Sequence, residues 1–161
     1  MASTSTNKQP LLIDRVFNNL ITTNTLALGS DTDINIQGTN SAAVLVDCTA
    51  NDGGIVEDLW LIQRKTDAAY TVLFYLSNAI DYLRAGEAVY LGQLTTEGAV
   101  GTYKSAATLP AVLAPVPQVG TNSKNSALYI PSGKALWTTL QIVTPLGNND
   151  GPIVGAQGGF Y

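Results

Sequence analysis

The chain contains no histidine, a single cysteine and few charged residues, which make up 12% of its length. Without histidine, neither a Ser-His-Asp nor a Cys-His catalytic arrangement can form within the chain. A zinc site draws on several Cys and His ligands, so this class of centre is excluded as well. The lone thiol cannot form an intrachain disulfide, and its apolar surroundings predict that Cys48 is a small buried side chain.

Carboxylates are the remaining source of metal-binding or acid–base chemistry. Asp31, Asp33 and Asn35 resemble the start of a calcium loop. However, Ile36 stands where that loop needs glycine, and Ala42 stands where it needs a bidentate glutamate. No other pattern nominates a catalytic pair of carboxylates. We therefore expect no enzymatic activity, no metal site and no cofactor.

Eight basic residues against twelve acidic ones leave a net charge of −4, and no cluster of Lys or Arg occurs. Binding to nucleic acid phosphates normally requires a basic face, so we expect no nucleic acid partner. The longest apolar runs, at residues 42–46 and 72–76, are about a quarter of the length of a membrane-spanning helix. Residues 1–8 are polar and lack the apolar core of a signal peptide. We expect no membrane association.

Residues 1–24 are interpreted as an N-terminal arm and residues 25–161 as the body. Within the arm, the segment Leu11–Leu20 fits two conformations. A helix would explain the spacing of four apolar residues, with Pro10 at its first position. These residues are Ile13, Val16, Phe17 and Leu20. An extended strand or arm is favoured instead, because β-branched residues and asparagine follow at once.

In the body the apolar period shortens to two, which is typical of β-strands. Strands are expected at Ala42–Cys48, Val56–Arg64, Tyr70–Leu76, Ala88–Leu94, Ala127–Ile130, Leu136–Val143 and Ile153–Gln157. The turn at 66–69 predicts a hairpin between the second and third of these strands. The turn at 131–133 predicts another between the fifth and sixth. Within Leu136–Val143, Leu136 and Leu140 are expected to face away from Trp137.

Residues 95–126 break this pattern and are interpreted as a long irregular connection, with one short edge strand at Leu109–Leu113. Apolar side chains on both faces of 59–62 and 72–76 predict central strands that are covered on each side. About eight short strands, without helical stretches, predict an all-β fold. We expect an antiparallel β-sandwich of jelly-roll type with an extended N-terminal arm.

Aromatic side chains raise the possibility of carbohydrate binding, since Trp60 or Trp137 could form part of a sugar platform. Trp60, however, lies inside the apolar run Leu59–Ile62. We therefore expect it in the core or at a seam between subunits. A carbohydrate-binding β-sandwich module remains an alternative function of a different class.

Three parts of the sequence resemble the capsid decoration, or cement, proteins of tailed bacteriophages. They are the arm Ser5–Arg15, the segments Gly53–Ile62 and Tyr70–Leu76, and the end of the chain at Leu128–Trp137 and Gly155–Tyr161. The resemblance rests on a strand leading into the turn Ile-Pro-Ser-Gly, an aromatic strand after it, and a Gly-Gly-aromatic terminus. It implies a jelly-roll-like body, a shell-binding arm, oligomers on the capsid surface and no enzymatic activity.

On this basis we expect a virion structural protein that bridges subunits of the major capsid protein on the capsid surface. Apolar arm residues would enter grooves of the shell, while Asp14 and Arg15 would fix the register. The expected capsid-binding residues are Lys8, Leu11, Leu12, Ile13, Asp14, Arg15, Val16 and Phe17. We also expect that residues 1–20 can be removed without unfolding the body. A tail- or fibre-associated virion protein is the alternative within the same class.

Self-association is a further expectation, with a homotrimer favoured and a dimer second. Decoration occurs at symmetric junctions of a shell, where a matching oligomer repeats one contact several times. Aromatic residues in sparsely charged segments suit interface centres. Candidate interface residues are Tyr103, Phe160 and Tyr161. The last two residues could instead close the end of the protein's own sandwich.

Overall fold

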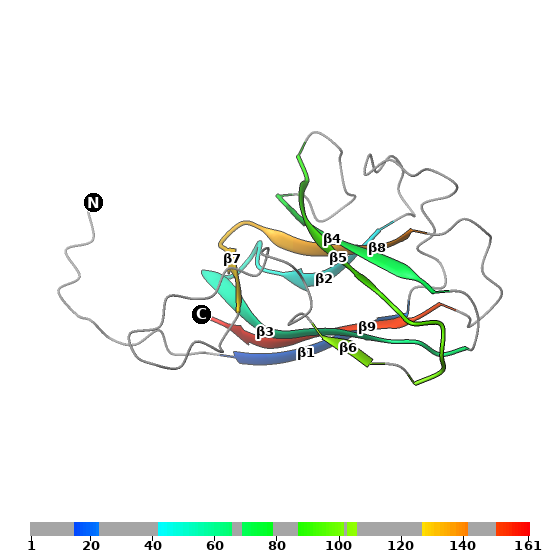
Figure 1. Cartoon of the computed structure of the whole chain (residues 1–161). Helices are drawn as coiled ribbons and strands as arrows, with labels where there is room; N and C mark the ends of the chain where they lie inside the picture. Colours follow the sequence, from blue (N-terminus) through cyan, green and yellow to red (C-terminus); the bar gives the residue numbers. More distant parts are fainter. Residues whose placement is uncertain are drawn as a thin grey trace, which may run out of the picture.

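A computed structural model of the chain contains nine β-strands in two antiparallel sheets, which lie one above the other as the layers of a β-sandwich (Figure 1). It describes residues 15–22, 42–65, 69–78, 87–101, 103–105, 127–141 and 151–161. Helix is absent from these residues. In this part of the chain there is accordingly no helix long and apolar enough to span a membrane. The all-β prediction and the sandwich are confirmed.

One layer is a five-stranded sheet. Its strands are β1 (Arg15–Thr22), β9 (Ile153–Phe160), β3 (Gly53–Ile62), β6 (Tyr103–Ser105) and β7 (Leu128–Pro131). The order across the sheet is β1-β9-β3-β6, and β7 pairs with the other end of β3. The long central strand β3 thus binds the short strands β6 and β7 at opposite ends of one edge.

The second layer is a four-stranded sheet with the order β2-β8-β4-β5. Its strands are β2 (Ala43–Asp47), β8 (Ala135–Gln141), β4 (Thr71–Ser77) and β5 (Val89–Thr95). β1 and β2 are the end strands of their sheets and lie along the same side of the sandwich, where they contact each other.

The core forms between the two layers because alternate side chains of each strand point inward. Its fully buried members include Leu59, Leu61, Leu136, Leu140 and Val154. On the other face of the four-stranded sheet, the side chains that point away from this core form a second buried cluster. This cluster comprises Leu73, Tyr75, Ala135 and Trp137. The predicted orientation of Leu136 and Leu140 away from Trp137 is confirmed, and so is the burial of β4 on both faces.

Two predicted hairpins are wrong. β3 and β4 lie in different sheets, and so do β7 and β8. The turn at Ser132–Gly133 is present, with a positive φ of 77° at Gly133 and a hydrogen bond from the Lys134 N–H to the Pro131 carbonyl. It directs the chain from one layer to the other instead of folding it back. Turn residues mark where a chain changes direction, but pairing partners are set by burial of the strand faces.

The segment predicted as an arm is partly a strand of the sandwich. Residues 15–22 form β1, in full antiparallel register with β9 from Arg15 opposite Phe160 to Thr22 opposite Ile153. The extended conformation is therefore confirmed over helix for these residues. The expectation that residues 1–20 can be removed without unfolding the body stays a prediction, and residues 15–20 of β1 lie within the segment that such a deletion would remove. Residues 1–14 fall outside the described residues.

The irregular connection and the strand ends differ in detail from expectation. Residues 103–105, inside the predicted connection, form β6 on the edge of β3. Gly53, expected in a turn, begins β3, where its φ of 134° and the nearby Ile130 carbonyl favour glycine. A Cβ at Gly53 would lie only 2.9 Å from the Ile130 carbonyl oxygen. The predicted strand Leu109–Leu113 and the calcium-like residues 31–35 lie outside the described residues.

Cys48 is fully buried in the core, as predicted, and burial raises the pKa of its thiol to about 11, with the neighbouring Asp47 carboxylate adding to the shift. The unfolded chain has the ordinary pKa of 9.0. The contribution of this thiol to stability is therefore complete below pH 9 and is lost as the pH rises through about 11.

We expect the free energy of unfolding to fall over this alkaline range, with the thiol accounting for on the order of 2 kcal/mol. Denaturant unfolding at a series of alkaline pH values measures the fall. The variant Cys48→Ala removes the thiol, so its stability should depend less steeply on pH. An identical slope for the variant and the natural chain would contradict the assignment.

Candidate functional site

The candidate site is the outer face of the five-stranded sheet, on which side chains form three cross-strand rows. The first apolar row consists of Val16, Gly159, Ile55 and Tyr129 on β1, β9, β3 and β7. The polar row consists of Asn18, Gln157 and Asp58. The second apolar row consists of Leu20, Gly155 and Trp60. Each row contains residues that are direct partners in the sheet register, so their side chains share one face.

The apolar rows are partly exposed, unlike the usual polar outer face of an antiparallel sheet. Val16, Leu20 and Tyr129 have 72%, 61% and 50% of their surface exposed. Ile55 and Trp60 are half-buried. Large exposed apolar side chains that are contiguous, rather than scattered, are typical of interaction surfaces.

Glycine on β9 shapes the second apolar row. The Trp60 indole lies over Gly155, where a Cβ would come within 2.2 Å of the ring carbon Cζ2. Any larger residue at position 155 would lift the indole off the sheet. Trp60 therefore belongs to the outer face, so the expectation that it lies in the core is wrong.

Tyr129 forms an aromatic corner at the end of the first apolar row. Its ring centroid lies 6.2 Å from that of Tyr161, whose backbone N–H donates to the Gly53 carbonyl. Burial raises the pKa of Tyr161, and Tyr129 and Glu57 add to the rise. The C-terminal residue is thus held against the end of β3.

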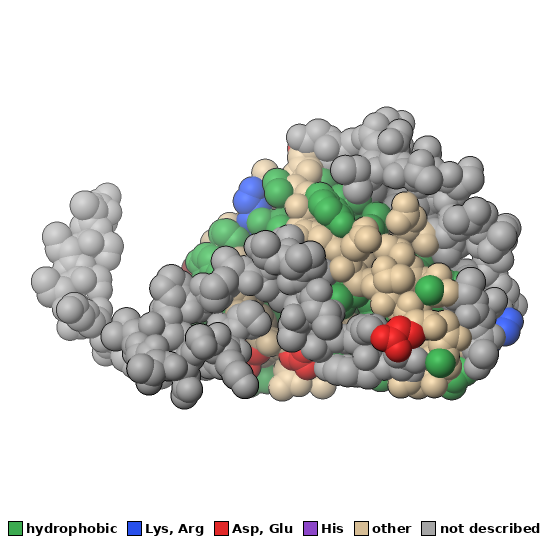
Figure 2. All heavy atoms as spheres, in the orientation of Figure 1, with side chains coloured by type: hydrophobic (Ala, Val, Ile, Leu, Met, Phe, Trp, Pro, Cys, Tyr) green, Lys and Arg blue, Asp and Glu red, His purple; other side chains and the backbone are tan. Residues whose placement is uncertain are grey.

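Charge on this part of the molecule is sparse. A β-bulge between Val56 and Asp58 leaves Glu57 exposed, next to the polar row. Figure 2 views the two layers from the side, and among the described residues visible there the acidic and basic side chains are isolated spots. Such a surface forms broad contacts through shape and burial more readily than through ion pairs.

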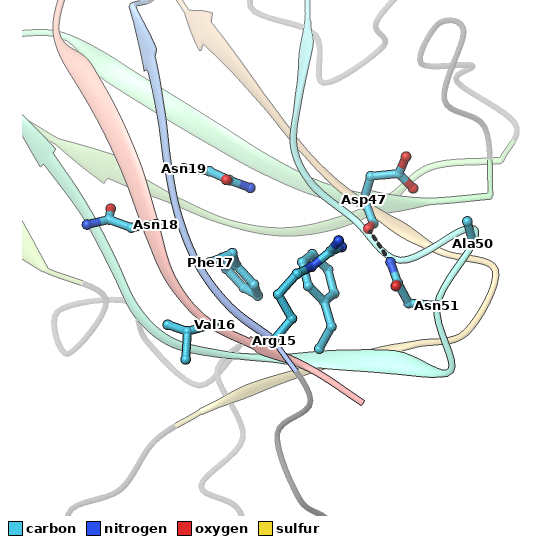
Figure 3. Close-up of a pocket in the computed structure, with 9 residues that line it drawn as sticks. Arg15, Val16, Phe17, Asn18, Asn19, Asp47, Ala50 and Asn51 are labelled. Carbon is cyan, nitrogen blue, oxygen red and sulfur yellow. Dashed lines mark hydrogen bonds between the residues drawn. The ribbon is translucent and has the colours of Figure 1, made fainter.

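An open groove of about 710 Å³ lies beside this face, between the edges of β1 and β2. In Figure 3, Arg15, Phe17 and Asn19 point toward Asp47 and Asn51, while Val16 and Asn18 point the other way.

Several contacts order the groove. The Arg15 guanidinium lies 4.9 Å from the centre of the Phe160 ring, and the Asn19 amide donates to the Leu45 carbonyl. Asp47 accepts from the Thr49 backbone N–H at 2.8 Å, which stabilises the turn after β2. These side chains therefore already form contacts within the folded chain.

The predicted capsid-binding residues divide into three groups. Lys8, Leu11, Leu12, Ile13 and Asp14 lie outside the described residues. Arg15 and Val16 are exposed on β1. Phe17 is only 6% exposed, and its ring packs 4.7 Å from that of Phe160, so it is a core residue and not a shell anchor.

The predicted oligomer interface residues are not brought together as an exposed set. Phe160 is buried against Phe17. Tyr161 is half-buried beside Tyr129. Phe160 is therefore part of the core, and Tyr161 packs beside Tyr129 with its backbone N–H on the Gly53 carbonyl. Tyr103 lies in β6, opposite Ile62, and its side chain is outside the description.

The structure adds Ile55, Tyr129, Gly155 and Gly159 to the residues suggested by the sequence. The signal that could have located the outer face is the pair of glycines at positions 155 and 159, each two residues from Gln157 in β9. The described ranges hold no group of three or more His, Cys, Asp or Glu side chains placed to bind a metal. Comparisons with protein-family models, curated proteins and solved structures found no significant match to this chain.

Proposed function

We propose that this chain is a virion structural protein that decorates a bacteriophage capsid and stabilises it by bridging subunits of the major capsid protein. The observation that carries the proposal is the partly exposed apolar outer face of the five-stranded sheet. Cementing a shell requires a broad contact area and no reaction, and the exposed side chains of Val16, Leu20 and Tyr129 provide apolar area on a rigid sheet. In this role the chain acts without catalysis or a cofactor and sits on the capsid surface.

We further infer that the sandwich is of the jelly-roll type. A jelly roll is a long hairpin wound around a core. Its first strand therefore pairs with its last strand, its second strand with the second-to-last, and each following pair lies closer to the middle of the chain. Setting β7 aside, the pairs β1–β9, β2–β8, β3–β6 and β4–β5 follow this rule. Viral capsid domains and lectins are built on jelly rolls, which supports the proposal by analogy of fold.

The contact with the shell is placed on the outer face, with the segment before β1 as a second contact. β1 begins at Arg15 on the edge of this sheet, and we propose that residues 8–14, which precede it in the sequence, supply this second contact. Of the predicted capsid-binding residues, Arg15 and Val16 are the two that lie on the outer face or at its edge. Phe17 has no part in the contact, because its ring is needed in the core.

The test compares two exposed positions on opposite sheets. Tyr129→Asp places a carboxylate in the first apolar row, whereas Val89→Asp places one on β5, where Val89 is 60% exposed. Both variants should fold, because both side chains are at the surface. In co-sedimentation with undecorated shells, we expect Tyr129→Asp to weaken binding about tenfold or more and Val89→Asp to bind as the natural chain does. Equal binding by all three proteins would contradict the placement of the contact.

A sugar-binding module is the second candidate, and Trp60 is the observation that favours it. Its indole lies over Gly155, beside the polar row of Asn18, Gln157 and Asp58. A flat aromatic ring with neighbouring amides and a carboxylate is a suitable platform for a sugar ring. Titration with host-surface polysaccharides distinguishes the two: saccharide binding that Trp60→Ala abolishes would favour this candidate.

Location on the particle separates capsid decoration from the tail- or fibre-associated role. A protein of the capsid surface co-purifies with tailless heads, whereas a tail protein is lost with the tails. Fractionation of heads and tails, followed by immunodetection of the chain, therefore tests this part of the proposal directly.

A further inference from the structure

The exposed edge of the five-stranded sheet is formed by β1. Of the strands that the structure describes, only β9 pairs with it. β1 is eight residues long, and its only charged residue is the first, Arg15. Natural edge strands are usually protected by central charges, proline, bulges or short length, because their unpaired N–H and C=O groups otherwise bind another strand. None of these devices occurs between Val16 and Thr22.

We propose that two copies of this chain pair through β1, antiparallel and about a two-fold axis at Asn18, to form one continuous sheet. In this arrangement Asn18 lies opposite Asn18 of the second copy. Val16 lies opposite Leu20 of the second copy, and Leu20 lies opposite its Val16. The proposal specifies the self-association that the sequence led us to expect, and it does not depend on capsid binding.

The rows of the outer face select this register. In an antiparallel pair, directly opposed residues share one face of the sheet. With the axis at Asn18, the polar row of one copy runs directly into the polar row of the other. Each first apolar row continues through Val16 into Leu20 and the second apolar row of the partner copy. The two faces thus join with apolar beside apolar and amide beside amide.

Other registers fit less well. An axis at Asn19 places Asn18 opposite Leu20 of the second copy, and an axis at Phe17 places Asn18 opposite Val16. In each of these two registers, the Asn18 amide would lie opposite an exposed apolar side chain. An axis at Leu20 keeps the rows matched but leaves the first part of β1 unpaired.

Charge favours the antiparallel orientation. With the axis at Asn18, each Arg15 lies opposite Ile21 of the second copy, so the two guanidinium groups are at opposite ends of the paired strands. A parallel pair would place them side by side, where like charges repel. In the proposed contact, Val16 of each copy packs beside Leu20 of the other on the outer face, and both side chains are largely exposed in the single chain.

A two-fold contact closes on itself after two copies. It therefore predicts a dimer, or an assembly of dimers, in place of the trimer that shell symmetry favours. The mass of the full chain in solution distinguishes these states, and sedimentation velocity at micromolar concentration should give twice the 16.9 kDa of one chain.

The axis at Asn18 is tested by charge pairing across it. Asn18 is exposed on the outer face, so Asn18→Asp and Asn18→Lys should both leave the fold intact, as checked by circular dichroism and thermal unfolding. Each variant alone opposes like charges, so we expect its dimer dissociation constant to rise about tenfold or more. An equimolar mixture opposes unlike charges and should restore a heterodimer. Monomeric natural chain, or no recovery in the mixture, would overturn the proposal.

Cysteine cross-linking provides an independent measurement. In Asn18→Cys, the two thiols meet across the axis at a spacing that suits a disulfide, about 4.5–5.5 Å between Cα atoms. The matched control is Gln157→Cys, also exposed on the outer face but on the inner strand β9. Cys48 is buried and contributes little background. Oxidation should cross-link the first variant and not the second; equal yields would exclude the β1 contact, whatever the result of the shell-binding assay.

Discussion

Gly158→Ala is expected to lower the free energy of unfolding by about 3 kcal/mol, the upper end of overpacking effects. Gly158 lies on the inner side of β9, opposite Phe17 on β1 and Val56 on β3. A Cβ at this position would lie 1.9 Å from the Ile55 carbonyl oxygen and 2.9 Å from Cζ of Phe17. The first of these atoms is backbone, so β3 would have to shift next to its bulge. Denaturant unfolding followed by circular dichroism measures the loss.

The neighbouring position supplies the control. Gln157 is exposed on the opposite side of the same strand, and Gln157→Ala should change stability by no more than about 0.5 kcal/mol. If both alanine variants were equally stable, the close approach of β9 and β3 at Gly158 would be wrong.

Phe17→Ala should cost about 3–5 kcal/mol, as expected when a large buried aromatic side chain is removed. The Phe17 ring packs on Phe160 and fixes β1 to the rest of the core. Its neighbour offers a matched control, since Val16 lies on the same strand with its side chain in solvent. Val16→Ala should leave stability nearly unchanged.

This pair of variants also decides where the body of the protein begins. An arm that is separate from the body predicts little loss of stability for either substitution. A strand of the sandwich predicts a large loss for Phe17→Ala alone. Thermal unfolding of the two variants, side by side with the natural chain, gives the answer.

Much of the fold follows from local patterns in the sequence. Alternating apolar residues located β4, β5 and β8 to within a residue or two, and they correctly assigned Leu136 and Leu140 to the core side of β8. Low charge and the absence of helical periods predicted the all-β class. These features depend on the side chains of one strand, so a single sequence reveals them.

Pairing between strands was harder to predict. Both hairpins inferred from turns are connections between the two layers, because β3 and β7 pair with each other and not with the strands that follow them. β1 pairs with β9, from the opposite end of the chain. Such contacts are determined by which faces need burial together, and a turn motif carries no information about that.

The outer face could not be found for a related reason. Its rows join residues of four strands, and membership depends on register and on a bulge at Glu57. Trp60 was expected in the core or at a seam between subunits because it lies in an apolar run, and strand alternation places it outward, over Gly155. Phe160 and Tyr161 were candidate interface residues because aromatic residues in sparsely charged segments suit interface centres, whereas Phe160 is buried against Phe17 and Tyr161 is half-buried beside Tyr129.

Electron cryo-microscopy of virions that carry this chain tests the proposed function most directly. We predict copies of the β-sandwich on the capsid surface, with the outer face of Leu20, Trp60 and Tyr129 turned toward the major capsid protein. Density for the chain on the tail, or on the shell with this face turned to solvent, would contradict the proposal.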